Sequence, residues 1–523
     1  MTEFHNEYTW GKAVNENSEE KFHSNFDNAI EETKKEFNQK YPAIIGGKDF
    51  FSNECFQVRS PANREIIIAE FPLCTTKDVL DAIDSAKNSF EEWRNSSYKE
   101  RIQVFRECAD DFSKDKFHLA AIMTFENGKN RIEAMNDVDE AIDFMRFYAL
   151  QLEKNEGFCK PTPHPNTKEK TRVVMRPFGV WGIIAPFNFP SAISIGMTTG
   201  ALLTGNTAVL KPSSDAPLSS YYFVRNIFNK IPHGAINFVT GPGSVVGNAL
   251  IESKDVAGIA FTGSYDVGMS GLKKFTEHTV KPFISEMGGK NPVIVTKNAN
   301  LDSAAEGVMR AAFGYAGQKC SACSRVYVQE DVAEQFTKKL IEKTKKLKIG
   351  MPWEKEVFLG PIINESAKKK YDDAVSMAKK EGQILSGGSV ILGSELRNGY
   401  FVEPTIVSNL SDDSKLVKEE LFLPFVCVQK YQDFDDALKK ANDTEYGLTA
   451  GIFSEDKTQV EKFFDKIQAG VLYANRTASA TTAALVFAQP FGGWKNSGST
   501  GKGAGGENYL QQFMRSQTQT RFD

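Results

Sequence analysis

The chain has 523 residues, of which 41% are hydrophobic and 25% are charged. This composition excludes wholesale disorder and collagen-like repeats, and the length predicts about two to four domains. Lysine and arginine total 63 against 67 acidic residues, and the net charge of -4 does not favour nucleic acid or anionic lipid as a partner. No stretch approaches the roughly 18 uninterrupted apolar residues of a spanning helix, so we expect no membrane span.

The N-terminus and the cysteines both indicate a cytoplasmic protein. Residues 1–39 are rich in Glu, Asp and Asn, and they lack both the apolar core of a signal peptide and the Arg-rich bias of a transit peptide. The seven cysteines are odd in number and scattered, unlike the set in a small secreted protein, so we expect reduced thiols. Because the six histidines are scattered singly, the sequence predicts no metal site.

The first part of the chain is predicted to be helical. A T-x-x-D capping box at Thr75 and Asp78 opens a pattern of apolar residues at helical spacing that reaches Trp93. Three further helices are expected, at 102–112, 117–125 and about 133–152. Residues 157–171 contain three prolines and several charges, and they predict a loop that leads into a strand at 172–175.

The remainder of the chain alternates between short apolar runs and helical patterns. The predicted strands lie at 180–185, 207–210, 236–239, 258–261, 292–295 and 325–328, and a helix is expected at 301–313. Strands that alternate with helices indicate βαβ units on parallel sheets, with nucleotide sites at the carboxyl ends of the strands. We therefore predict an α/β fold with two α/β domains, the second ending near residue 472.

Three turns that follow predicted strands are candidates for an anion or cofactor site. Residues 241–247 (GPGSVVG) have the spacing G-x-G-x-x-x-G, one residue longer than the dinucleotide fingerprint, and such glycine sets are often plain turns. Ser264 opens a predicted helix, where its hydroxyl either faces an anion or serves as a simple N-cap. Lys211 follows a strand, although an isolated lysine is usually solvated surface.

The chemically most informative segment is 317–325, Gly-Gln-Lys-Cys-Ser-Ala-Cys-Ser-Arg. Cys320 and Cys323 have the C-x-x-C spacing of a redox pair, and a dithiol function is one interpretation. In the other interpretation Cys320 is a lone nucleophile and Cys323 is a small buried residue. Lys319 and Arg325 are expected to lower the pKa of the thiol if their charges face it.

A cysteine nucleophile without a histidine partner requires another base and a group that stabilises an oxyanion. Glu286 precedes a Gly-Gly pair, where its carboxylate could lie at the edge of a cleft. Asn188 lies in Pro-Phe-Asn-Phe-Pro and offers a side-chain amide donor. Taken singly, a glutamate is most often a surface charge, and an asparagine beside proline is most often a turn residue.

Taken together, these segments resemble the aldehyde dehydrogenase superfamily over roughly residues 45–498. The resemblance rests on Pro186-Phe-Asn-Phe-Pro, Lys211-Pro-Ser-Ser, Phe261-Thr-Gly-Ser, Glu286-Met-Gly-Gly-Lys, Gly317-Gln-Lys-Cys, Glu420-Leu-Phe and Pro490-Phe-Gly-Gly, in the family's order. It implies a Rossmann-like NAD(P)-binding domain with a helical N-terminal part (1–156 and 177–287), a catalytic α/β domain (288–488) and a bridging, oligomerisation element (157–176 and 489–523). A homo-oligomer is expected on the same analogy.

The resemblance also implies a role for each candidate residue. Cys320 would add to the aldehyde carbon, and Asn188 with the Cys320 backbone N–H would hold the oxyanion. After hydride transfer to NAD, Glu286 would activate the water that hydrolyses the thioester. The implied cofactor contacts are Ala185, Phe187, Lys211, Ser214, Gly243, Gly247, Ser264, Glu420 and Phe422. Because Ser214 lies where NAD-preferring relatives often carry glutamate, NADP is also expected to be accepted.

Residues 312–325 are close to the branch of the superfamily that oxidises L-glutamate γ-semialdehyde, the 1-pyrroline-5-carboxylate dehydrogenases. In that branch Lys319 and Ser321 would bind the α-carboxylate of the substrate. The loop 477–488 supplies further substrate contacts there, but here it is longer and has Ala483 where glycine is usual, so that the backbone approach is expected to change. Leu423 also replaces a glycine, beside the expected nicotinamide contacts.

The sequence therefore predicts an NAD(P)-dependent enzyme that oxidises L-glutamate γ-semialdehyde to glutamate in proline and arginine catabolism. The alternatives are a dehydrogenase for another aldehyde, such as succinate semialdehyde, an acylating enzyme that passes its thioester to coenzyme A, and a non-catalytic cofactor-binding protein. An acylating enzyme would not need the base Glu286, and a non-catalytic protein would not need Cys320. The sequence leaves open whether residues 1–41 pack on their own subunit or on a neighbour.

Overall fold

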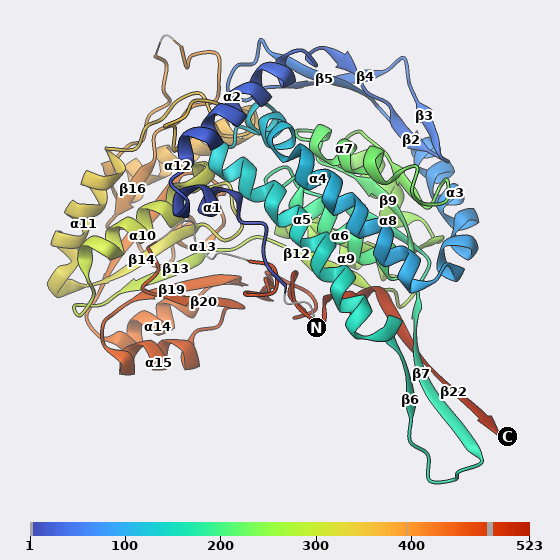
Figure 1. Ribbon diagram of the computed structural model, residues 1–523. Helices are drawn as coiled ribbons and strands as arrows, with labels where there is room; N and C mark the ends of the chain where they lie inside the picture. Colours follow the sequence, from blue (N-terminus) through green and yellow to red (C-terminus); the bar gives the residue numbers. More distant parts are fainter. Residues whose placement is uncertain (1–3, 394, 478–484, 523) are drawn as a thin grey trace.

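The computed structural model describes residues 4–393, 395–477 and 485–522, and it contains two α/β halves and a projecting hairpin (Figure 1). The first half is built on a seven-stranded sheet in the order β12-β11-β8-β9-β10-β2-β3. Its strands are β2 (Ala43–Ile45), β3 (Lys48–Phe50), β8 (Val180–Ile184), β9 (Thr207–Lys211), β10 (Ile236–Phe238), β11 (Val256–Thr262) and β12 (Phe283–Glu286). Strands β8 to β12 are parallel, whereas β2 and β3 form an antiparallel edge.

The strand order of this sheet reverses at β8, because β9 and β10 follow on one side and β11 and β12 on the other. In open parallel sheets, ligands bind outside the carboxyl ends of the strands at such a reversal. The turns that begin there are 185–191 after β8 and 263–264 after β11. The α/β fold predicted from alternating strands and helices is confirmed.

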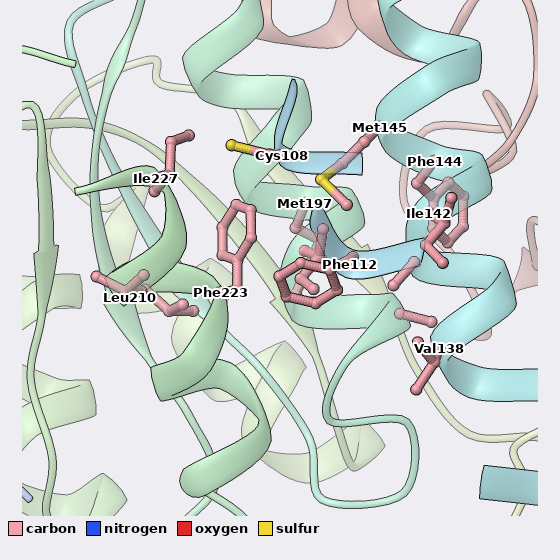
Figure 2. Close-up of a cluster of buried hydrophobic side chains, with 14 of the residues drawn as sticks. Cys108, Phe112, Val138, Ile142, Phe144, Met145, Met197, Leu210, Phe223 and Ile227 are labelled. Carbon is pink, nitrogen blue, oxygen red and sulfur yellow. The ribbon is translucent and has the colours of Figure 1, made fainter. Parts of the chain in front are cut away.

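Helices cover both faces of the first sheet. The helices α3 (Thr76–Asn95) and α8 (Asn248–Glu252) share a buried cluster with Val209, whereas α6 (Ala192–Leu203) and α7 (Leu218–Ile227) share another with the adjacent Leu210. Neighbouring strand residues point to opposite faces, so the sheet separates the two clusters. Figure 2 shows the second cluster, in which side chains of α6 and α7 meet those of two long helices. The capping box predicted at Thr75 and Asp78 is present at the start of α3.

The two long helices of the cluster, α4 (Tyr98–Glu126) and α5 (Arg131–Lys154), lie against the first half (Figure 1). The prediction of separate helices at 102–112 and 117–125 is wrong, because α4 runs through both. The intervening residues 113–116 break the apolar pattern because Lys114 and Asp115 are exposed, whereas Ser113 and Lys116 are half-buried against Glu7. Two N-terminal helices, α1 (Thr9–Asn15) and α2 (Glu19–Lys34), pack on α4 and α5 of the same chain.

A three-stranded sheet in the order β22-β7-β6 projects from the body (Figure 1). It consists of β6 (Cys159–Thr162), β7 (Glu169–Pro177) and β22 (Met514–Phe522), and the short 3-10 helix η4 (Tyr509–Phe513) precedes β22. The predicted loop at 157–171 is therefore wrong, because most of this segment is a β-hairpin. Pro161 is accommodated because β6 is an edge strand, where a missing N–H costs no ladder hydrogen bond.

The second half is built on another seven-stranded sheet, in the order β15-β16-β17-β14-β13-β19-β20. Its strands are β13 (Asn291–Val295), β14 (Cys323–Gln329), β15 (Gln383–Ser386), β16 (Thr405–Ser408), β17 (Phe425–Tyr431), β19 (Thr449–Phe453) and β20 (Val471–Ala474). All but the edge strand β15 are parallel. Its helices are α10 (Leu301–Phe313), α11 (Glu330–Thr344), α12 (Glu365–Glu381), α13 (Lys415–Lys418), α14 (Phe434–Asn442) and α15 (Lys457–Lys466).

Shorter elements complete the described chain. They are β1 (Gln39–Lys40), β4 (Cys55–Arg59), β5 (Ile67–Pro72), η1 (Glu156–Phe158), η2 (Gly243–Gly247), α9 (Tyr265–Phe275), η3 (Gly314–Gly317), β18 (Tyr446–Gly447) and β21 (Trp494–Lys495). Among the described residues, no helix has the apolar length that a bilayer crossing requires. Within the same residues, no group of three or more His, Cys, Asp or Glu side chains could hold a metal ion.

Candidate active site

Cys320 lies in a tight segment between η3 and β14. Three consecutive residues before it, Tyr315, Ala316 and Gly317, have positive φ angles of 50°, 52° and 68°. Glycine is required at the third position, because a Cβ there would lie 2.2 Å from the carbonyl oxygen of Leu423. The backbone before the thiol is thus held in a left-handed turn by the segment that carries the predicted nicotinamide contacts.

The carbonyl groups around Cys320 are fixed by a side chain that sequence reasoning missed. Asn291, the first residue of β13, donates from Nδ2 to the carbonyl oxygens of Cys320 (2.8 Å) and Ala322 (2.9 Å). Its Oδ1 accepts a hydrogen bond from the Thr449 backbone N–H at 3.0 Å. All polar groups of this buried amide are therefore used to tie the segment of the nucleophile to β13 and β19. The only local signal was a polar residue directly after the Glu286-Met-Gly-Gly-Lys motif.

The structure brings Asn188 to the backbone that precedes the thiol. Asn188 is buried in the turn after β8, and its Nδ2 donates to the carbonyl oxygen of Gln318 at 3.2 Å. The turn itself is held by Asn127, whose Nδ2 donates to the carbonyl oxygen of Phe187 at 3.1 Å. A side-chain amide is thus aimed at the edge of the nucleophile, which is the arrangement that an oxyanion site requires.

Glu286, the last residue of β12, is held by the Pro490-Phe-Gly-Gly motif. Its Oε2 accepts a hydrogen bond from the Gly493 backbone N–H at 3.2 Å. Burial raises the pKa of this carboxyl to about 8, although the Gly493 hydrogen bond opposes the rise. Such a group can take up or release a proton near neutral pH, as a general base must.

Burial also raises the pKa of the Cys320 thiol, to about 12, and the charges of Glu420 and Glu286 contribute to the rise. The expectation that Lys319 and Arg325 lower this pKa is wrong. Lys319 is ion-paired elsewhere, and the buried Arg325 guanidinium donates to the carbonyl oxygens of Lys290, Lys440 and Ala441. Cys323 is buried in the core of the second half and donates from Sγ to the Arg325 carbonyl oxygen at 3.6 Å.

The charged groups beside the nucleophile come from helix α5. The ammonium of Lys319 is only 5% exposed and contacts both carboxylate oxygens of Glu133 at 2.7 Å. Two turns further along α5, Glu140 interacts electrostatically with Lys319, and burial raises the pKa of Glu140 to about 8. Ser321 is buried on the other side of Cys320, and Ala483 lies outside the described residues. Sequence reasoning missed Glu133 and Glu140, which have no local motif.

Several predicted cofactor residues meet at the carboxyl edge of the first sheet. The Lys211 ammonium, at the end of β9, is buried and donates to the carbonyl oxygen of its neighbour Pro212 at 2.8 Å. Burial lowers its pKa to about 8, although Asp215 opposes the change. The Ala185 backbone N–H donates to the Lys211 carbonyl oxygen at 3.0 Å. Gly247 lies beside the Lys211 side chain, since a Cβ at this glycine would be 4.0 Å from Lys211 Cδ.

Other predicted cofactor residues leave open groups at the same edge. Ser264 is exposed at the start of α9 and its side chain caps no backbone group, so its hydroxyl and the first amides of the helix are free to meet an anion. Gly243 is exposed as well, and a Cβ there would meet nothing within 4 Å. Ser214 donates to the Gly241 carbonyl oxygen at 3.0 Å, which fixes the turn 241–247.

The remaining predicted cofactor residues lie between this edge and Cys320. The rings of Phe187 and Phe422 are in edge-to-face contact, with centroids 5.8 Å apart. Glu420 accepts a hydrogen bond from the Gly289 backbone N–H at 2.9 Å. Leu423, the departure from glycine, is buried in the core of the second half. Packing therefore accommodates its side chain.

The chain is similar to known proteins over most of its length. The matching family model is described as the aldehyde dehydrogenase family and covers residues 50–519. The chain belongs to the aldehyde dehydrogenase family. Among aldehyde dehydrogenases, the 1-pyrroline-5-carboxylate dehydrogenase of Bacillus cytotoxicus is 38% identical over 499 residues, which are 94% of this chain and 95% of that protein. The resemblance to this branch, expected from residues 312–325, is confirmed.

Solved structures of aldehyde dehydrogenases agree with this family assignment. A 1-pyrroline-5-carboxylate dehydrogenase from Thermus with bound NAD has a TM-score of 0.92 at 31% identity, with 100% of each chain covered. Proline utilization A from Bdellovibrio bacteriovorus has a TM-score of 0.91 at 34% identity over 95% of this chain. The chain spans about half the length of that second protein, 52%.

Proposed function

We propose that this aldehyde dehydrogenase oxidises L-glutamate γ-semialdehyde, the open form of 1-pyrroline-5-carboxylate, to L-glutamate with NAD, a step of proline breakdown. The observation that carries the proposal is the buried Lys319 next to Cys320, with the carboxylate of Glu133 beside it. An amino-acid aldehyde carries an α-carboxylate and an α-ammonium group. These charges match a buried cation paired with a carboxylate, whereas a simple aliphatic aldehyde has no group to pair with them.

The carboxyl edge of the first sheet fits a dinucleotide. Lys211 offers a buried ammonium whose one acceptor is the carbonyl of the next residue, and Ser264 offers an uncapped helix start. Phe187, Phe422 and Glu420 lie between this edge and the thiol. When bound, NAD supplies the hydride acceptor and a positive charge beside the thiol. Because Ser214 is small and neutral, NADP would not be repelled by a carboxylate at this position.

The chain's own residues account for the other steps. The Cys320 sulfur forms a bond to the aldehyde carbon as its thiol proton passes to solvent water, and the carbonyl oxygen becomes an oxyanion that accepts hydrogen bonds from Asn188 Nδ2 and the Cys320 N–H. Loss of the hydride converts this adduct to a thioester. Glu286 then takes a proton from water, which attacks the thioester carbon and releases the acid and the Cys320 thiol.

A substrate panel tests this proposal. We expect kcat/KM for 1-pyrroline-5-carboxylate to exceed those for succinate semialdehyde and propanal, with free glutamate as product and no stimulation by coenzyme A. A much higher kcat/KM for succinate semialdehyde would contradict the substrate, and stimulation by coenzyme A would indicate the acylating reaction. In Lys319→Met we expect KM for 1-pyrroline-5-carboxylate to rise about 100-fold, while propanal, which cannot use the cation, changes less than about threefold.

The assembly and location are part of the proposal. The two sheets and the projecting strands support the division into a cofactor-binding unit, a catalytic unit and a bridging element. The free edges of the projecting sheet support a homo-oligomer, in which a second copy pairs with or covers the strands. All seven cysteines, each in the described part of the chain, are free thiols, which supports a reducing compartment such as the cytoplasm.

A further inference from the structure

Residues 4–9, here called the N-terminal arm, lie along helix α5 of their own chain and are held by two buried carboxylates. The Thr9 backbone N–H and hydroxyl both donate to Asp139 at 2.7 Å. The Glu7 backbone N–H donates to Asp143 at 2.8 Å. Asp139 and Asp143 are four residues apart and only 5% and 3% exposed, so they form one face of α5 that the arm covers.

The far end of the arm contacts a segment almost at the other end of the chain. Asn6 donates from Nδ2 to Asp143 Oδ2 at 2.8 Å and to the carbonyl oxygen of Val486 at 3.1 Å. The Phe4 ring packs edge-to-face on Phe147 of α5 and on Phe487, with centroids 5.2 Å and 6.1 Å apart. One asparagine amide thus bridges α5 and residues 485–487.

Residues 485–487 need such support. Phe487 has a φ angle of 73°, an unfavourable conformation for a bulky residue that persists only when neighbours hold it. Its N–H donates to the Gly505 carbonyl oxygen at 2.8 Å, and the Gly505 N–H donates to the Tyr148 hydroxyl at 2.9 Å. Tyr148 belongs to α5, the helix that also carries Glu133 and Glu140, so this segment is tied to that helix by a hydrogen bond.

The arm and the site therefore use two sides of one helix. Glu133 and Glu140 face Lys319, whereas Asp139 and Asp143 face the arm. The arm thus contacts residues 486 and 487, at the end of loop 477–488, as well as the helix that carries the site carboxylates.

We propose that the N-terminal arm is a positioning element for substrate specificity, in which Asn6 and Phe4 fix residues 485–487 relative to α5. This inference rests on the proposed function, because it gives the arm an indirect role in binding the α-carboxylate and α-ammonium groups of that substrate. Neither residue touches the reacting atoms. Their loss should therefore weaken the binding of an aldehyde with charged groups and leave a small apolar aldehyde almost unaffected.

The test compares Asn6→Ala and Phe4→Ala with Thr9→Val. This control loses both hydrogen bonds of the Thr9 hydroxyl, to Asp139 and from Lys116, but touches no residue of 485–487. For the two former variants we expect KM for 1-pyrroline-5-carboxylate to rise about tenfold, with propanal kinetics and KM for NAD within about twofold of wild type. Thr9→Val should keep the wild-type ratio. Equal changes for both aldehydes, or a change in melting temperature alone, would overturn the proposal and leave the arm a structural strap.

Two further measurements distinguish a failure of this inference from a failure of the proposed function. Hydrogen exchange at the Phe487 amide should accelerate in Asn6→Ala and not in Thr9→Val, since only the first loses the contact with Val486. The wild-type substrate panel is measured in the same series. A wild type that prefers succinate semialdehyde contradicts the proposed substrate, whereas an unchanged Phe487 exchange rate with an unchanged substrate ratio in Asn6→Ala contradicts the arm's role.

Discussion

Burial favours the uncharged forms of the two groups that are expected to react, with the pKa of Cys320 raised to about 12 and that of Glu286 to about 8. For an acid with a raised pKa, the proton is retained below that pKa and the basic carboxylate accumulates above it. Glu286 is therefore poised to accept a proton only as the pH approaches and passes 8. The hydrolysis of the thioester should follow the same ionisation.

Glu286→Gln tests this role, because the amide keeps the shape of the carboxyl but cannot accept a proton from water. We expect steady-state turnover to fall by about 10²–10⁴-fold, while one equivalent of reduced cofactor still forms in a rapid first phase. The wild-type rise in kcat through pH 8, measured under conditions where hydrolysis limits the rate, should vanish. Loss of the first phase together with turnover would show that Glu286 acts before hydrolysis.

The two cysteines of the C-x-x-C pair have different environments, and substitution separates their roles. Cys320→Ala removes the nucleophile, and we expect kcat/KM to fall by at least about 10⁴-fold. Cys323→Ala removes a buried thiol whose partner is a backbone carbonyl, so kcat/KM should stay within about threefold of wild type. If the second variant were also inactive while folded, as judged by circular dichroism, the dithiol interpretation would regain support.

At the scale of elements, strand β13 presents Asn291 to the segment of the nucleophile. Asn291→Ala leaves the carbonyl oxygens of Cys320 and Ala322 and the Thr449 N–H without their partner. We expect a loss of about 1–3 kcal/mol in the free energy of unfolding and a fall in kcat/KM for every aldehyde alike. Urea unfolding and the aldehyde panel measure the two effects.

Asn300→Ala is the matched control for that experiment. Asn300 caps α10 in the same half of the molecule, where its Oδ1 accepts a hydrogen bond from the Ser303 N–H at 3.0 Å. Losing the cap costs about 1 kcal/mol but should leave kcat/KM unchanged, since no group near Cys320 loses a partner. A parallel fall in activity in this control would attribute the effect of Asn291→Ala to general destabilisation.

Elements with a local signal were predicted from sequence, and those that depend on distant contacts were not. Helix α10 spans the predicted residues 301–313, because its apolar residues repeat at helical spacing along its whole length. The hairpin at 159–177 was missed, because its prolines and charges are typical of loops and its strand β7 also pairs with the distant β22. The sequence of residues 159–177 gives no sign of β22, which lies more than 300 residues further along the chain.

The same limit applies to the candidate site. Cys320, Glu286 and Asn188 each lie in a short motif at the end of a strand or before one, so sequence alone could single them out. Glu133 and Lys319 form an ion pair although they are 186 positions apart in the chain, and the sequence around neither residue indicates the pair. Asn291 was missed for the same reason, since its hydrogen-bond partners lie in the segment before β14 and in β19.

At the scale of the whole molecule, the projecting sheet has two unpaired edges, because β6 and β22 each pair only with β7 within the described chain. Exposed edges of this kind favour pairing or covering by another chain. Truncation after Phe513 removes β22, and we expect the assembly to dissociate to a smaller species in light scattering coupled to size exclusion. Gln519→Ala, which loses side-chain hydrogen bonds with Arg172 and Gln517 but keeps the strand, is the control and should retain the native mass.

An unchanged mass after truncation would contradict an assembly role for this sheet. Activity measured on the truncated chain adds a second reading, since the site described above lies wholly within one subunit. Turnover per chain should therefore survive dissociation, provided that the truncated chain keeps the wild-type circular dichroism. A complete loss of activity in a folded, dissociated chain would instead show that a neighbouring subunit completes the site.

The hydrogen bond from Asn6 to Val486 joins residues 480 positions apart in the chain. During synthesis on the ribosome, the arm must wait until Val486 has been made before this contact can form. Asp139 and Asp143 become available far earlier, and the arm can dock on them first. The arm therefore finishes docking late in folding. In a nascent chain, or in one shortened before Val486, only its contacts with α5 can form.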